Sequence, residues 1–168
     1  MNHYPTLTIL LVEDHSQTRQ AILTALVGWK HSVFPTASAL EALDVLAHHP
    51  EIQMMITDWV MPDIDGLELC RLARSLERDR YLHILMLTAR SGKEDLVEAL
   101  ESGADLFLAK SLNLSELRFQ LQAVQRAAYL EQQLAERLVE VQSQNLELER
   151  RNEELARARS EAEQANEA

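Results

Sequence analysis

Five short apolar runs, alternating with helical patterns, limit the fold of this chain more than any other feature of its sequence. The third run is continuously apolar, which is typical of a central strand covered on both faces. Because strands and helices alternate, we predict an α/β fold with a doubly wound, five-stranded parallel sheet and helices on both of its faces. The predicted strands are Leu7–Val12, Ser32–Phe34, Met54–Ile56, His83–Leu87 and Leu106–Ala109.

Start and stop signals delimit the helices between these strands. One helix is expected over Ser16–Gly28, because a serine begins the pattern and a glycine ends it. Ser38 can cap a second helix, with Glu41 three residues later as in a capping box. Two further helices are expected over residues 67–76 and 93–101.

Four of the predicted strands end in side chains that could perform chemistry. Glu13 and Asp14 follow the first strand, Asp58 the third, Thr88 the fourth and Lys110 the fifth. An aspartate after a strand is common by itself. In a parallel sheet, however, ligands bind at the carboxyl ends of the strands. The convergence of three acids, a hydroxyl and an ammonium group at that edge therefore predicts a functional site, with the acid pair as a candidate cation site.

The order and spacing of these residues resemble a known family. The acid pair, the segment DWVMPDIDG at 58–66, the dipeptide Thr88–Ala89 and the late Lys110 are similar to the receiver domain of two-component response regulators, over about residues 5–125. The resemblance implies a flavodoxin-like sheet with the strand order 2-1-3-4-5. It also implies that Asp58 is a phosphoacceptor, served by a cognate histidine kinase or phosphotransfer protein.

The resemblance further implies a divalent metal, Mg²⁺ or Mn²⁺. Its ligands would be Glu13, Asp14, Asp58 and the backbone carbonyl of Val60. The chemistry agrees, because a carboxylate that attacks a phosphoryl group is repelled by the phosphoryl oxygens unless a hard cation bridges the two. The product of the attack would be an aspartyl phosphate.

Two residues would contact the phosphoryl group by the same resemblance: Thr88 through its hydroxyl and Lys110 through its charge. Phe107 occupies the position of the family's aromatic switch, in place of the commoner tyrosine, and would act together with Thr88. Ser111 follows Lys110 where the family usually has a proline in a cis peptide. The Lys110–Ser111 peptide therefore departs from the family pattern.

The last third of the chain differs in composition. From Leu114 onward it contains no glycine or proline, which favours one continuous helix that Asn113 can cap, with Glu116 completing a capping box. Positions a and d of its heptads form an apolar seam with two asparagines, as in parallel two-stranded coiled coils. The seam consists of Leu134, Leu138, Val141, Asn145, Leu148, Asn152 and Leu155.

We therefore divide the chain into a receiver core, residues 1–112, and a long helix, residues 113–168. The seam predicts a parallel homodimer formed by two copies of the long helix. A single solvated helix is the alternative, because the seam extends over only roughly three to four heptads.

Charge and composition exclude several partners. With a net charge of −11, the chain has no basic stripe for a phosphate backbone, so we expect no direct nucleic-acid ligand. Cys70 is the single cysteine, and no signal peptide or apolar run of membrane-spanning length is present. We therefore expect a reduced, cytoplasmic protein without membrane contact.

Together these features predict a receiver that transmits its phosphorylation state to a dimeric helix and has no enzymatic activity beyond its own phosphoryl transfer. One alternative makes the chain the regulatory N-terminal fragment of a hybrid histidine kinase, a diguanylate cyclase or a phosphatase. Another is a metal-dependent phosphohydrolase with Asp58 as nucleophile, although Val60 stands where such enzymes carry a second acid. A third is a structural coiled-coil adaptor, which would not respond to phosphoryl donors.

Overall fold

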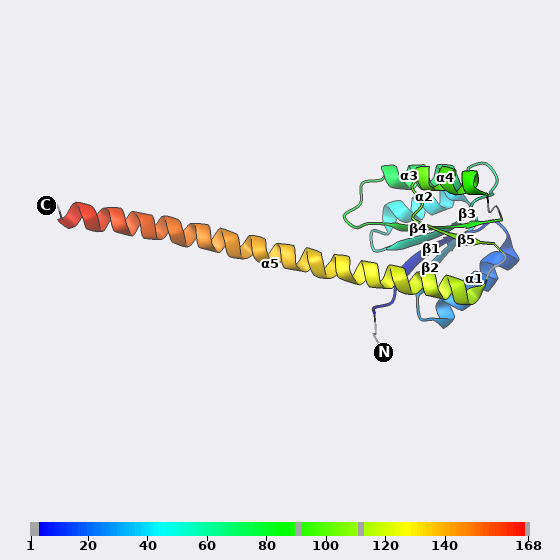
Figure 1. The fold of residues 1–168 in the computed structure, drawn as a ribbon, viewed down its shortest axis with the longest axis horizontal. Coiled ribbons are helices and arrows are strands. Elements are labelled where there is room, and N and C mark those ends of the chain that lie inside the picture. Colours follow the sequence, from blue (N-terminus) through cyan, green and yellow to red (C-terminus); the bar gives the residue numbers. More distant parts are fainter. Residues whose placement is uncertain (1–3, 90–91, 111–112, 167–168) are drawn as a thin grey trace. The chain divides into compact units, whose positions relative to one another are not determined.

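The computed structural model describes residues 4–89, 92–110 and 113–166 (Figure 1). The chain forms two compact units, Met1–Ala128 and Tyr129–Ala168. The strands are β1 (Thr8–Val12), β2 (Ser32–Thr36), β3 (Met54–Asp58), β4 (His83–Thr88) and β5 (Leu106–Ala109). The helices are α1 (Ser16–Gly28), α2 (Ala39–His48), α3 (Gly66–Ser75), α4 (Lys93–Glu101) and α5 (Leu114–Asn166).

The strands form one parallel sheet in the order β2-β1-β3-β4-β5, which confirms the predicted fold class and strand order. The pairing extends from Thr8 beside Ser32, between β1 and β2, to Thr88 beside Ala109, between β4 and β5. Because all pairs are parallel, the strands end together at one edge of the sheet, which we call the carboxyl edge. They begin together at the opposite, amino edge.

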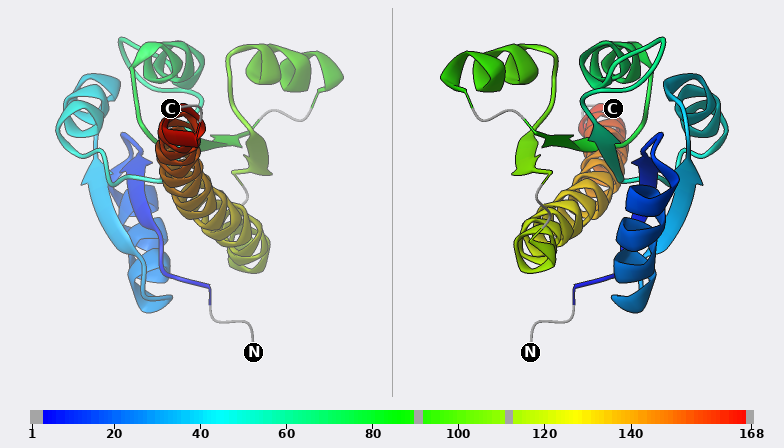
Figure 2. Two further views of the ribbon diagram at one scale, coloured as in Figure 1. Left: turned by 90° about the vertical axis from the view of Figure 1, so that its left-hand side faces the viewer. Right: turned by 90° about the vertical axis from the view of Figure 1, so that its right-hand side faces the viewer.

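Helices cover both faces of this sheet. α2, α3 and α4 pack on one face, and α1 and the first turns of α5 pack on the other (Figure 2). Successive strand residues point to opposite faces, so that Leu10 packs in the first of these layers and Leu11 in the second. Burial on both faces explains why the strands are continuously apolar. Cys70 lies in the first layer, where burial raises the pKa of its thiol to about 12.

Side chains from the sequence signals cap two of the helices. At α2, Ser38 Oγ accepts a hydrogen bond from the N–H of Glu41 at 3.3 Å, as predicted. The Glu41 carboxylate accepts from the N–H of Ala37 at 2.9 Å, one residue earlier than in a capping box. At α3, Asp65 accepts from the N–H of Glu68 at 2.8 Å. Both caps fix where a helix leaves a loop of the carboxyl edge.

The start of α5 belongs to the first compact unit. Asn113 Oδ1 accepts a hydrogen bond from the N–H of Ser115 at 3.0 Å, which confirms the predicted cap. The domain boundary that we predict at residue 112, and the peptide to Ser111, lie outside the described residues. The buried residues of α5 are Leu117, Leu121, Val124 and Ala128.

In the second unit, the apolar residues of the seam are each at least half exposed, from 50% for Val141 to 68% for Leu155. Arg137 pairs with Glu140 and Arg151 with Glu147 inside the same helix. These charges are therefore neutralised within one copy of the helix. The coiled coil itself requires a second copy and stays a prediction. Among the described helices, none is apolar over a length that could cross a membrane.

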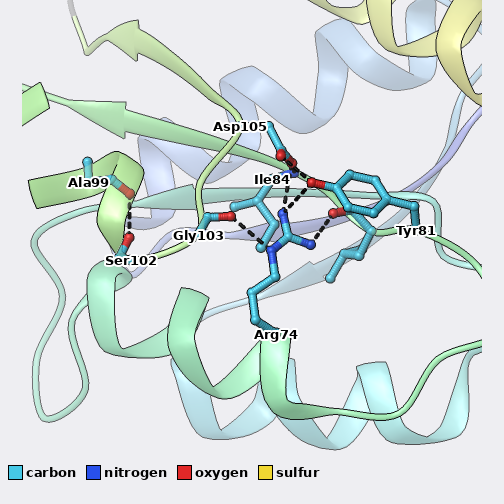
Figure 3. A network of polar contacts seen from close by, with 8 residues as sticks. Arg74, Tyr81, Ile84, Ala99, Ser102, Gly103 and Asp105 are labelled. Carbon is cyan, nitrogen blue, oxygen red and sulfur yellow. Dashed lines mark hydrogen bonds and ion pairs between the residues drawn. The ribbon is translucent and has the colours of Figure 1, made fainter. Parts of the chain in front are cut away.

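A polar network fastens β4 to β5 at the amino edge (Figure 3). Arg74, from α3, donates to the carbonyl of Leu82 at 2.6 Å and to that of Gly103 at 2.9 Å. Its guanidinium also pairs with the carboxylate of Asp105 at 2.8 Å. Tyr81 donates to the second oxygen of the same carboxylate. No sequence pattern predicted this network, because its members come from separate elements.

Candidate functional site

The predicted acids and the predicted lysine converge at the carboxyl edge. Asp58 is the last residue of β3, Glu13 and Asp14 follow β1, and Lys110 follows β5. One carboxylate oxygen from each of the three acids lies within 4.8 Å of the other two. Glu13 and Asp58 are buried, whereas Asp14 is exposed. The cluster therefore has a buried floor and one acid open to solvent.

The loop after β3 holds Asp58 in place. The N–H of Trp59 donates to the carbonyl of Leu87 at 3.0 Å, and the N–H of Gly66 donates to the carbonyl of Trp59 at 2.8 Å. A Cβ atom on Gly66 would lie 2.2 Å from the carbonyl oxygen of Asp58. Only glycine therefore allows α3 to begin this close to the acid.

Lys110 is the cation of the cluster. Its Nζ donates to Asp58 Oδ2 and lies 3.5 Å from Glu13 Oε2. Burial lowers the pKa of the ammonium, but the hydrogen bond and the charge of Asp58 outweigh that effect and raise the pKa overall. Lys110 is anchored to the sheet, because its N–H donates to the carbonyl of Thr88 at 2.8 Å. It is therefore a permanently charged group that faces two acids.

Glu13 is fully buried and only partly satisfied. Its Oε1 accepts a hydrogen bond from the N–H of His15 at 3.1 Å. Among the described residues, its Oε2 has no hydrogen-bond partner, and the contact with Lys110 is at the outer limit of a hydrogen bond. Burial raises the pKa of the Glu13 carboxyl. The hydrogen bond from His15 lowers this pKa and the negative charge of Asp58 raises it, so that the pKa is raised overall.

These acids fit a hard divalent cation. Oxygen donors from three carboxylates suit Mg²⁺ or Mn²⁺. Among the described residues, the buried Oε2 of Glu13 has no hydrogen-bond partner and only the 3.5 Å ion pair with Lys110, so it is an acceptor that such a cation could satisfy. Val60 lies two residues beyond Asp58, with a side chain that is 63% exposed. Its role as a carbonyl ligand stays a prediction.

The two predicted switch residues lie in the last two strands. Thr88 is buried at the end of β4. Phe107 is half-buried in β5, beside Met86 of β4, and packs against the layer formed by α2, α3 and α4. Their phosphoryl-dependent roles stay predictions.

Sequence reasoning missed one residue next to the acid pair. Arg19, in α1, donates through Nη1 to the carbonyl of Glu13 at 2.6 Å. The available signal was a basic residue on the helix that follows two adjacent acids. Without the fold, that arginine could equally have pointed to solvent.

Known relatives share this part of the chain. The family profile of the response regulator receiver domain matches residues 9–122. The chain is 40% identical over 119 residues to response regulator RppA of Synechocystis sp., which covers 70% of this chain and 50% of RppA. It is 31% identical over 117 residues to a chemotaxis protein CheY homolog of Campylobacter jejuni, which covers 69% of this chain and 90% of that protein. The chain thus spans about half the length of RppA.

Solved structures agree with the fold. Chemotaxis protein CheY4 of Vibrio cholerae is 29% identical, with a TM-score of 0.66 over 71% of this chain and 99% of that one. A probable two-component system response regulator/GGDEF domain protein is 27% identical, with a TM-score of 0.67 over 73% of this chain and 50% of that one. A chain of the Saccharomyces cerevisiae complex of Ypd1 with the Ssk1 receiver domain is 22% identical, with a TM-score of 0.64 over 71% of this chain and 89% of that one. At this identity, the similarity shows the fold alone. The matched profile, the relatives and the strand order together mean that this chain belongs to the receiver-domain family of two-component response regulators.

Proposed function

We propose that this chain is a phosphorylation-switched receiver in which Asp58 accepts a phosphoryl group from a histidine kinase or a phosphotransfer protein. The observation that carries the proposal is the cluster at the carboxyl edge, where Asp58 touches Lys110 and lies beside Glu13 and Asp14. Membership of the receiver family supports it, since receiver domains are phosphoacceptors and not enzymes with turnover. The single, buried Cys70 suits a reduced cytoplasmic setting.

In the proposed step, a carboxylate oxygen of Asp58 attacks the phosphorus of a phosphohistidine. An O–P bond forms and the P–N bond breaks, and the departing imidazole nitrogen keeps the electron pair. The ammonium of Lys110 offsets charge on one phosphoryl oxygen, and the hydroxyl of Thr88 donates to another. Thr88 moves toward the phosphoryl group, and Phe107 rotates into the space that this movement opens.

The proposed step depends on Mg²⁺ or Mn²⁺. Receiver domains bind Mg²⁺ in an acidic pocket, and the acidic group of this chain has the composition of such a pocket. Glu13, Asp14, Asp58 and the carbonyl of Val60 would hold the cation. The cation would reduce the repulsion between the attacking carboxylate and the phosphoryl oxygens.

The proposed output is a parallel homodimer formed through the seam of the second unit. The exposed apolar residues of the seam support it, and Asn145 and Asn152 favour a parallel, in-register pairing in which each asparagine faces its own counterpart. In an antiparallel pair, an a position faces a d position, so each asparagine would face leucine or valine.

A second proposal concerns the protein as a whole. The matched response regulator/GGDEF domain protein is covered over only 50% of its chain, and RppA over 50% of its length. This chain would then be the regulatory N-terminal part of a larger protein, such as a hybrid histidine kinase, a diguanylate cyclase or a phosphatase. The receiver chemistry is the same in both proposals.

One experiment separates the candidate functions. The chain is treated with Mg²⁺ and acetyl phosphate, and its intact mass is measured. A receiver gains one phosphoryl group that hydroxylamine removes. In a parallel assay with a phosphate monoester, a phosphohydrolase releases inorganic phosphate continuously, and a structural adaptor gives neither result.

The dimer is tested by analytical ultracentrifugation with and without beryllofluoride. The parent is expected to change its self-association on activation. Replacing both Asn145 and Asn152 with leucine is expected to strengthen self-association and blunt this response, because apolar a positions tolerate other registers. A parent that is monomeric in both states at tens of micromolar would contradict the dimeric output but leave the phosphoacceptor role standing.

A further inference from the structure

Arg19 reaches back from the second turn of α1 to the loop that carries the acid pair. Its Nη1 donates to the carbonyl oxygen of Glu13 at 2.6 Å and to that of Asp14 at 3.3 Å. Hydrogen bonds from a charged donor are roughly twice as strong as those between neutral groups. One guanidinium nitrogen therefore fixes the backbone of both adjacent acids.

A second contact orients the side chain of Glu13. The N–H of His15, the residue before α1, donates to Glu13 Oε1 at 3.1 Å, which leaves Oε2 facing Lys110 at 3.5 Å. The side chain of His15 does not cap the helix. The direction in which both acids leave the backbone is thus set by the two peptide planes that Arg19 holds.

We propose that Arg19 is a positioning residue for the divalent-cation site, and that it aligns the backbone of Glu13 and Asp14 so that their carboxylates face one point with Asp58. This inference rests on the proposed function, because it requires that the three acids bind a cation. It assigns Arg19 no contact with the cation or the phosphoryl group.

The charge of Arg19 makes this inference testable. A guanidinium group beside the acid pair weakens the attraction of the two carboxylates for a divalent cation. If Arg19 acted through its charge alone, its removal would tighten Mg²⁺ binding. If it positions the acids, its removal weakens Mg²⁺ binding. The two roles predict effects of opposite sign.

The test is a Mg²⁺ titration of the full chain, followed by tryptophan fluorescence. All proteins carry Trp29→Phe, so that the signal comes from Trp59, which adjoins Asp58. The variants are Arg19→Gln and Arg19→Lys. Lys30→Gln is the matched control, because it removes one positive charge from an exposed position just beyond the other end of α1.

Arg19→Gln is expected to raise the Kd for Mg²⁺ about tenfold, as loss of a group that orients metal ligands commonly does. Arg19→Lys is expected to recover part of the affinity, and Lys30→Gln to match the parent. In the metal-free protein, the amide NMR signals of Glu13, Asp14 and His15 are expected to move in Arg19→Gln and not in Lys30→Gln.

Thermal unfolding of each variant shows whether it is folded. If Arg19→Gln is not folded, the Mg²⁺ affinity of Arg19→Lys is compared with that of the parent instead. An Arg19→Gln protein that is folded and binds Mg²⁺ as tightly as the parent, or more tightly, overturns the inference while the proposed function stands. A parent that binds no Mg²⁺ overturns the proposed function and the inference with it.

Discussion

At the amino edge of the sheet, Asp105 and Arg74 use almost all of their hydrogen-bonding capacity within the protein. At the carboxyl edge, Glu13, Asp58 and Lys110 do not. The Asp105 carboxylate accepts hydrogen bonds from Arg74, from Tyr81 and from the N–H of Ile84. Arg74 also donates to two backbone carbonyls. Most of the hydrogen-bonding capacity of this pair is therefore used inside the protein.

At the carboxyl edge, the single ammonium of Lys110 faces two buried acids, Asp58 and Glu13. Acceptors outnumber donors, and one oxygen of Glu13 has no hydrogen-bond partner among the described residues. Buried charge without full compensation destabilises a fold. The comparison teaches that an ion pair whose hydrogen bonds are all made inside the protein serves stability, whereas the cluster at the carboxyl edge keeps an acceptor available for a cation.

The largest expected effect is the loss of phosphoryl uptake, which should follow a substitution at the carboxyl edge but not one at the amino edge. Asp58→Asn is expected to abolish phosphoryl uptake from acetyl phosphate, because an amide is a poor nucleophile of the same shape. Asp105→Asn at the amino edge is the matched control and is expected to keep phosphoryl uptake while losing stability. Intact mass measures the first effect and urea unfolding the second. A stoichiometric, hydroxylamine-sensitive adduct on the Asp58→Asn protein would move the acceptor to another residue.

The next effect concerns stability at the amino edge. Arg74→Ala is expected to lower the free energy of unfolding by about 2–4 kcal/mol, because it leaves the carboxylate of Asp105 and two carbonyls without their charged donor. Urea denaturation measures it. Arg71→Ala, at an exposed ion pair of the same helix, is expected to cost less than about 1 kcal/mol. Equal losses from the two variants would contradict the role of the amino-edge network.

At the carboxyl edge, a neutral substitution is expected to stabilise the fold. Glu13→Gln removes a buried charge and is expected to raise the free energy of unfolding by about 1 kcal/mol in the absence of metal. It is also expected to weaken Mg²⁺ binding about tenfold, since a charged ligand is lost. Glu101→Gln, at an exposed position on α4, controls for net charge. A Glu13→Gln protein that is less stable than the parent would show that this acid is structural.

The smallest expected effect is a pH dependence at the amino edge. His31 Nδ1 accepts a hydrogen bond from the N–H of Leu7 at 3.0 Å, and burial lowers the pKa of this histidine from its ordinary value of 6.5. The stability that the neutral His31 side chain contributes is fully present above pH 6.5. It is lost as the pH falls through the lowered pKa, because the buried imidazole must then be protonated. This loss of stability is expected to be absent from His31→Gln.

Urea unfolding at pH 7.5 and at successively lower pH values measures this dependence. His48→Gln, at an exposed histidine of α2, is the control and is expected to follow the parent. Parallel stability curves for the parent and His31→Gln would show that protonation of His31 does not matter to the fold.

The fold and the edge that holds the candidate site could be read from the sequence, because both depend on local order along the chain. A continuous apolar run gives a central strand, and the residue that ends it, as Asp58 ends β3, must lie at the carboxyl edge. The contacts of Arg74 with Asp105 and of Arg19 with Glu13 could not be read in this way. Arg74 and Arg19 have the local patterns of ordinary exposed helix positions, and only the packing of separate elements brings them to Asp105 and Glu13.

The five-strand order makes β5 an edge strand that is paired on one side only. It has four residues, or about 13 Å of extended chain, with Asp105 tied to Ile84 just before it and Lys110 reaching Asp58 just after it. The strand is therefore held at both ends, by the contact of Asp105 at its start and by that of Lys110 at its end. Phosphorylation of Asp58, as proposed above, would change the contact at the Lys110 end and leave the one at Asp105 in place. A resulting displacement of β5 would then be smaller at Phe107 than at Lys110, because Phe107 lies nearer the end that stays held.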